Sequence, residues 1–229
     1  MARSIGPLAY GVVIVYSYGR AISTGVLLAD DAALRDTEEA LRIAERSSED
    51  LALAFARWAL GVALMHRDSP AEREHGLALL GQVRDMCLHG RFYQWLLAAV
   101  DVYTARELAR RGDRDGAIPV MRAAVDHLVR EGQLLASCVP ATGVLVDTLL
   151  DHGSESNVAE AEAAIERLAA APADDGLVIR DTWLLRLRAL LSRACGDDVA
   201  YRDFAGRYLA MAKSFGFEGH IAWAEAMIE

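Results

Sequence analysis

The sequence predicts an all-α protein, and three observations support this fold class. Ala, Leu and Arg have high helix propensities and occur 41, 30 and 23 times among the 229 residues. Only five prolines interrupt them. Short breaks containing Gly, Asp or Ser separate apolar segments of about 16 to 20 residues, which is the pattern of successive helix ends and N-caps.

Charge and rare residue types exclude several classes of chemistry. The net charge of −9 disfavours nucleic acid as a general partner, because backbone binding needs many cations. The single lysine, Lys213, has no Gly-rich loop before it, which removes phosphate-loop chemistry. Cys87, Cys138 and Cys195 lie more than fifty residues apart and fit neither a disulfide framework nor a zinc site. A cytoplasmic location is the expectation.

Residues 1–30 are predicted to form an apolar first helix. Its uncharged run, Leu8–Tyr18, is too short to span a membrane, so we expect a buried helix and no membrane association. The ends of helical-repeat proteins normally carry a polar cap, whereas Val12–Val15 is entirely apolar. We therefore expect this end to pack against a preceding domain or against a second copy, as a homodimer through Leu8–Tyr18.

Residues 31–216 are predicted to form about four helical hairpins, with a terminal helix at 217–229, in a single domain over 1–229. The first helix of each hairpin is apolar nearly all round, and these are Leu51–Met65, Phe92–Leu108, Leu134–Leu150 and Leu177–Leu191. The second is amphipathic, and these are Glu72–Met86, Asp115–Val129, Val158–Ala170 and Asp198–Ala212. This alternation is what a solenoid of stacked hairpins requires.

A degenerate repeat runs through the second helices. Small residues stand at Ala40, Gly76, Ala117, Ala161 and Ala200, at intervals of 36, 41, 44 and 39 residues. Four positions later come Ala44, Leu80, Met121, Ile165 and Phe204, and three positions after those Ser47, Val83, Ala124, Leu168 and Arg207. We call these three series of residues the repeat columns. The last series departs from the pattern at its two ends, Ser47 and Arg207, as expected for terminal repeats.

The pattern of a small residue, a large one four positions later and a small one seven positions later resembles the second helix of a tetratricopeptide repeat. Its best copy is Arg111-Gly112-Asp113 followed by Ala117, Met121 and Ala124, and Leu60-Gly61 matches the Leu-Gly pair of the first helix. The spacing exceeds the usual period, so the units are tetratricopeptide-like. The resemblance implies a right-handed superhelix of antiparallel hairpins.

From about Ala40 to its end, the chain resembles the helical-repeat region of actinobacterial adenylate/guanylate cyclase–P-loop ATPase proteins and related transcriptional regulators. The phrases that carry this resemblance are Ile43–Ser47, Arg110–Pro119 and Phe217–Ala224. In those proteins the catalytic domains precede the repeats. The resemblance therefore implies a regulatory module and brings no catalytic residue with it.

Arginines are the best binding candidates. Arg106 and Arg110 gather at one turn between helices, and Arg180, Arg186 and Arg193 lie along a first helix, the kind that usually lines the concave groove of a solenoid. Arg186 and Arg193 are seven residues apart and should share a face. We predict that the row along this first helix, Arg186 first, receives an acidic peptide or an anionic ligand, with Arg106 and Arg110 as further groove candidates. The alternative is pairing with acidic neighbours such as Glu166 and Asp181.

No catalytic residue, metal site or cofactor site is predicted. Cys138 is expected to be a small buried hydrophobe, in a helix that Pro140 would kink. Four histidines, His66, His89, His127 and His152, fall near helix C-termini, where capping accounts for them. The predicted function is a non-catalytic module for protein–protein interaction or regulation. The alternative is a solenoid that senses a small-molecule effector and controls a partner catalytic or DNA-binding domain.

Overall fold

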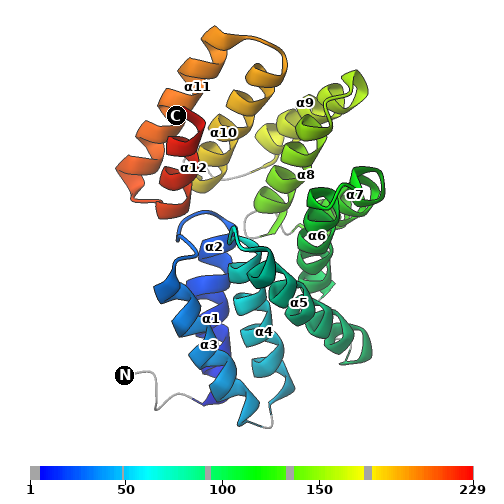
Figure 1. Cartoon of the computed structure of the whole chain (residues 1–229), viewed down its shortest axis with the longest axis vertical. Helices are drawn as coiled ribbons and strands as arrows, with labels where there is room; N and C mark the ends of the chain where they lie inside the picture. Colours follow the sequence, from blue (N-terminus) through cyan, green and yellow to red (C-terminus); the bar gives the residue numbers. More distant parts are fainter. Residues whose placement is uncertain (1–5, 48, 91–93, 133–136, 173–176, 229) are drawn as a thin grey trace. The chain divides into compact units, whose positions relative to one another are not determined.

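The computed structural model describes residues 6–47, 49–90, 94–132, 137–172 and 177–228, and within these ranges the chain is helical with no strand (Figure 1). The all-α prediction is confirmed. The chain divides into two compact units, Met1–Thr104 and Ala105–Glu229. The predicted single domain and the superhelix both stay predictions.

The first unit begins with one helical run over residues 7–23, so the apolar first helix predicted over residues 1–30 ends earlier and contains a π-helical stretch. α1 (Pro7–Ile14) runs into the π-helical turn η2 (Val15–Arg20) and the short α2 (Ala21–Ser23), after which a turn with Gly25 at φ +79° ends the run. Gly11 and Ile14 are buried, whereas Val12 and Val13 are exposed by 36% and 45%. The surface predicted to dimerise is thus partly used inside the unit, where α1 contacts α4.

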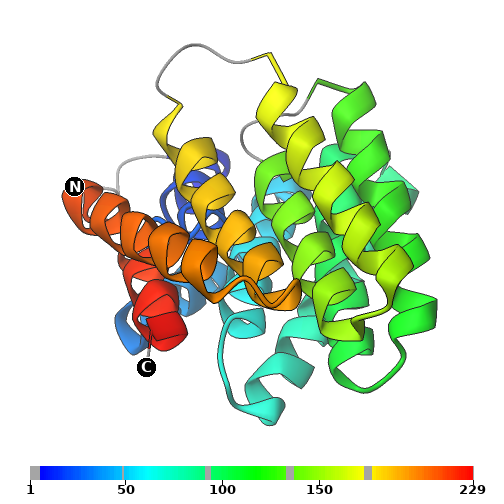
Figure 2. The same ribbon diagram turned by 90° about the horizontal axis from the view of Figure 1, so that it is seen from above.

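The remaining helices overlap the helices predicted from the sequence. The first unit continues with α3 (Asp31–Glu45), α4 (Asp50–Met65), α5 (Pro70–Gly90) and the start of α6 (Gln94–Arg110). The second unit holds α7 (Arg114–Arg130), α8 (Val139–His152), α9 (Glu155–Ala170), α10 (Val178–Ala194), α11 (Asp198–Phe215) and α12 (Glu218–Ile228). Figure 2 shows α8 beside α9 and α10 beside α11, each pair packed along its length.

Several helices begin and end at the short Gly, Asp and Ser breaks of the sequence. Side chains accept hydrogen bonds from the backbone of the first turn at the N-caps Asp30, Asp113, Ser154 and Asp197. Gly153 and Gly216 end α8 and α11 in the left-handed conformation, with φ of +73° and +66°. Pro140 is the second residue of α8 and directly follows Ser137 and Cys138, which are π-helical, and Val139. The predicted kink at Pro140 stays a prediction.

The repeat columns form the inner faces of the second helices. Ala40, Gly76, Ala117 and Ala161 are buried, as are Ala44, Leu80, Met121 and Ile165, while Ala200 and Phe204 of the last copy are half-buried. At the crossing of α4 and α5, a Cβ on Gly76 would lie 3.0 Å from the carbonyl oxygen of Gly61. The two backbones therefore touch at the glycine of the Leu60-Gly61 pair.

A second kind of close contact joins successive first helices. In the first unit Gly19 of η2 lies against the ring of Trp58 on α4, and in the second unit Gly143 of α8 lies against the ring of Trp183 on α10. A Cβ at either glycine would overlap the tryptophan ring. The same pairing of a glycine with an indole thus sets a helix–helix distance in both units.

In the described ranges, no helix combines the length and the apolar character needed to cross a bilayer.

Replacing Gly143 with Ala should destabilise the protein. The added methyl group would force Trp183 or α8 to move, at a cost of about 1–3 kcal/mol, which exceeds the gain in helix propensity. Gly206 on α11 is a matched control, since its Cβ would meet nothing within 4 Å. Gly206→Ala should stabilise the protein by about 0.4–1 kcal/mol. Urea unfolding of both variants measures the difference, and equal shifts would contradict the Gly143–Trp183 contact.

Candidate functional site

A groove of about 300 Å³ lies between the first helices α8 and α10 of the second unit. It is lined by Asp147, Leu150 and Asp151 of α8 and by Arg186, Leu190, Arg193 and Ala194 of α10. Arg186 and Arg193 were predicted to share a face because they are seven residues apart, and both line this groove.

Arg186 is held by an ion pair rather than left open to a ligand. Its Nη1 and Nη2 donate to the two carboxylate oxygens of Asp147, both at 2.9 Å. The side chains are exposed by only 14% and 25%. Burial alone would lower the pKa of Arg186, but the charge and hydrogen bonds of Asp147, with a smaller contribution from Asp151, raise it. Arg186 therefore ties α10 to α8 as a permanent cation.

Aromatic rings enclose the inner side of this ion pair. The Arg186 guanidinium carbon lies 5.4 Å from the Trp183 ring and 5.5 Å from the Trp223 ring, within cation–π range. Buried His220 of α12 contacts both indoles edge-on, and its Nδ1 is 2.7 Å from the Tyr208 hydroxyl. Burial is the main cause of the raised pKa of Tyr208. We call these residues, with Asp147, the Arg186 cluster.

The other predicted arginines are distributed around the unit. Arg180 pairs with Asp181 at 3.3 Å and donates to the Ala171 carbonyl. Arg193 lies over the Tyr201 ring at 5.7 Å. Arg110 is 3.7 Å from buried Glu107, and Arg106 is half-buried on the same helix. Arg106, Arg110 and Arg180 do not line the groove, so of the five predicted residues Arg186 and Arg193 are the two that do.

Pairing with acidic neighbours therefore accounts for much of the arginine pattern. Arg188 contacts Glu166 at 3.4 Å, so both acidic partners named from the sequence take part in ion pairs. Asp147 was not among them, because it lies 39 residues from Arg186. His220 was also missed. The sequence signal that could have indicated it is the mostly apolar stretch around it, Phe217–Ala224.

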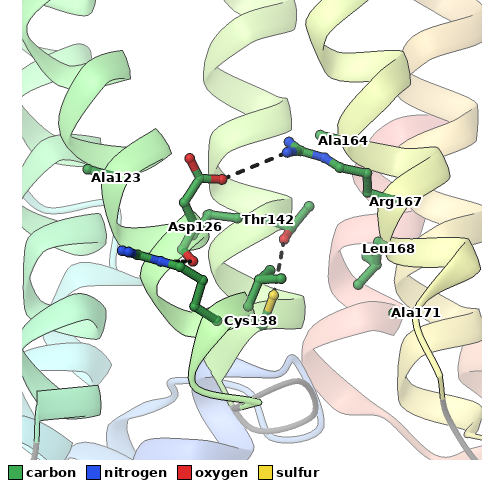
Figure 3. Close-up of a pocket in the computed structure, with 11 residues that line it drawn as sticks. Ala123, Asp126, Cys138, Thr142, Ala164, Arg167, Leu168 and Ala171 are labelled. Carbon is green, nitrogen blue, oxygen red and sulfur yellow. Dashed lines mark hydrogen bonds and ion pairs between the residues drawn. The ribbon is translucent and has the colours of Figure 1, made fainter.

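A larger pocket of about 630 Å³ lies elsewhere in this unit, between α7, α8 and α9 (Figure 3). Its lining is mostly apolar, with Ala123, Val125 and Val129 from α7 and Ala164, Leu168 and Ala171 at α9. Asp126, Arg130 and Arg167 are its charged residues, and Cys138 and Thr142 at the start of α8 are its neutral polar ones. No sequence pattern indicates this pocket, because residues of three separate helices form it.

The pocket's charged groups are loosely paired, and its thiol is neutral. Asp126 and Arg167 approach to 3.8 Å across the pocket, and both side chains are more than half exposed. Burial raises the pKa of the Cys138 thiol, while the hydrogen bond between Cys138 and Thr142 and the positive charge of Arg167 partly offset this. The prediction that Cys138 is a small buried hydrophobe is confirmed, since the residue is 1% exposed.

Among the described residues, no group of three or more His, Cys, Asp or Glu side chains is placed to hold a metal ion. Comparison with known proteins gave no match to any family model, to any curated protein or to any solved structure.

Replacing Asp147 with Asn should destabilise the protein by about 2–3 kcal/mol, because Arg186 would lose a charged partner in a mostly buried setting. Asp203 on α11, paired with Arg207 where both side chains are about 60% exposed, is the control. Asp203→Asn should change stability by less than about 0.5 kcal/mol. Thermal unfolding of both variants checks this. Similar losses would mean that Arg186 does not depend on Asp147.

The three cysteines should react with iodoacetamide in the order of their environments. Burial raises the pKa values of Cys87 and Cys138, so each holds less reactive thiolate at a given pH. Cys195 is exposed and should be alkylated at least about tenfold faster than either. Mass spectrometry of the native protein at pH 8 measures the three rates. Equal rates at Cys195 and Cys138 would contradict the burial of Cys138.

Proposed function

We propose that this chain is a non-catalytic, tetratricopeptide-like module for protein–protein interaction, a right-handed superhelix of antiparallel hairpins. The supporting observation is the α8–α10 groove, where the first helices of two successive hairpins meet and present charged and apolar side chains together. First helices line the binding groove in solenoids of this kind. The buried repeat columns support the same architecture.

The groove suits a short amphipathic segment that carries an acidic side chain. Leu150 and Leu190 are half-buried groove residues that can pack against an apolar anchor of the partner. Arg193 is exposed, and its guanidinium stacks on Tyr201, which limits the entropy lost when it binds a carboxylate. Arg186, held by Asp147, forms part of the groove wall. Arg193 is therefore the cation to which we assign recognition.

The resemblance to cyclase–ATPase proteins favours a catalytic domain of that class as the partner, in the cytoplasm. The three free cysteines, two of them buried, are consistent with that reducing compartment. A second copy of this chain, packed through Leu8–Tyr18, remains part of the proposal. Of that segment, Val12 and Val13 are exposed large apolar residues available for such a contact.

Photo-crosslinking in the native host tests the groove directly. A benzophenone amino acid replacing Leu190 should give a discrete covalent adduct with a partner protein, whereas the same residue replacing exposed Ala210 on α11 should not. Arg193→Glu should remove the Leu190 adduct because it repels an acidic segment. Arg202→Glu, a charge reversal at an exposed arginine on α11, should keep it.

Two outcomes would contradict the groove as the interaction site. One is the same set of adducts from positions 190 and 210, which would reflect contact by chance. The other is an adduct at position 190 that is unchanged by Arg193→Glu.

Effector sensing is a second candidate, and a separate observation favours it. The pocket between α7, α8 and α9 has the size and the apolar character of small-molecule sites, which run from about 300 to 1,000 Å³. In this function an effector in the pocket would alter the groove through α8, which lines both.

A further inference from the structure

We infer that the pocket between α7, α8 and α9 binds a monocarboxylate with an apolar body, of the kind represented by a medium-chain fatty acid. This inference does not depend on the protein-interaction function. It supplies the chemical class of ligand for the sensing alternative.

Shape and lining give the apolar part of the ligand. The pocket holds about 630 Å³, enough for a drug-sized molecule. Its walls are small or branched apolar side chains, and Ala164 and Leu168 among them are buried. Small residues at Ala123, Ala164 and Ala171 leave space that larger side chains would fill. An alkyl chain can occupy this space without leaving any polar group of its own unsatisfied.

Thr142 provides a hydroxyl for the ligand's polar end. The buried threonines Thr37, Thr148 and Thr182 each donate to the carbonyl four residues earlier, at 2.7–2.9 Å. Within the described part of the chain, the Thr142 hydroxyl instead contacts only the Cys138 sulfur, at 3.8 Å. Sulfur is a weak hydrogen-bonding group, so this hydroxyl keeps most of its capacity for a better acceptor. In Figure 3 it lies between the Asp126–Arg167 pair and Cys138.

The charges lining the pocket select an anion. Arg130 and Arg167 against Asp126 leave a surplus of one positive charge. The Arg130 Nε donates to the backbone carbonyl of Asp126, and Arg167 meets the Asp126 carboxylate only at 3.8 Å. A ligand carboxylate can therefore bind Arg167 while exposed Asp126 turns to solvent. A monoanion balances the surplus charge, whereas a zwitterion leaves it and an amine increases it.

The first experiment compares three ligands that share one alkyl chain: decanoate, 1-decanol and decylamine. Each is titrated below its micellar concentration into the full chain by isothermal calorimetry. Decanoate should bind at one saturable site and raise the melting temperature. Decanol should bind about tenfold more weakly, because it lacks the charge-assisted bonds, and decylamine should not bind. Equal affinity for decylamine and decanoate, or no binding by decanoate, would overturn the inference.

The second experiment places the carboxylate. Arg167→Gln should weaken decanoate about tenfold and leave decanol unchanged. Arg207→Gln is the matched control, because Arg207 and Arg167 are exposed by 60% and 61% and each pairs with an exposed aspartate. Thr142→Val, which keeps the side-chain shape, should weaken decanoate severalfold. Decanoate affinity that falls equally in Arg167→Gln and Arg207→Gln would overturn the inference, because the effect would then come from net charge alone.

Cysteine protection locates the site independently of affinity. Saturating decanoate should slow alkylation of Cys138, which lines the pocket, and leave alkylation of Cys87 in the first unit unchanged. Unchanged or equally slowed labelling of both would overturn the inference. Repeating the Leu190 crosslinking with decanoate separates the proposals: binding that protects Cys138 but leaves the adducts unchanged keeps the ligand site and removes the sensing function.

Discussion

The contact between Gly143 and Trp183 is the constraint from which the geometry of the second unit follows. The indole lies where a Cβ of residue 143 would be, so α8 and α10 cannot approach or separate without breaking that contact. One helical turn further along each helix stand Asp147 and Arg186, and the same spacing brings them to two hydrogen bonds of 2.9 Å. Leu190 and Arg193 lie about one and two turns after Arg186 on α10, and they line the groove beyond this ion pair.

The groups around the half-buried Arg186 explain how its charge is stabilised there. Asp147 satisfies two of its nitrogens, and the faces of Trp183 and Trp223 attract the guanidinium plane. Lysine, a compact and strongly hydrated charge, could not bridge both carboxylate oxygens and stack on indoles at once. The cluster therefore fixes a helix–helix distance, and the proposed function assigns recognition to the more exposed Arg193 instead.

Local rules predicted much of the fold, because helix caps, propensity and the periodic burial of Ala40, Gly76, Ala117 and Ala161 depend on residues close in sequence. The π-helical stretch after Ile14 was not predicted, since such a stretch has no recognisable pattern in an apolar run. The site was predictable only in part. Spacing on one helix placed Arg186 and Arg193 together, but the partner Asp147 and buried His220 come from other hairpins whose register no local pattern fixes.

The apolar pocket and the α8–α10 groove are both lined by α8, so a ligand in the pocket can affect the groove. Cys138 and Thr142 at the start of α8 line the apolar pocket, while Asp147 and Asp151 near its end line the groove. Gly143, packed on Trp183, stands between the two sets. A shift of α8 caused by a ligand at Thr142 must either carry α10 with it or separate Arg186 from Asp147. Only the second response changes the shape of the groove, which α8 and α10 line together, so effector sensing requires the Arg186–Asp147 pair to open.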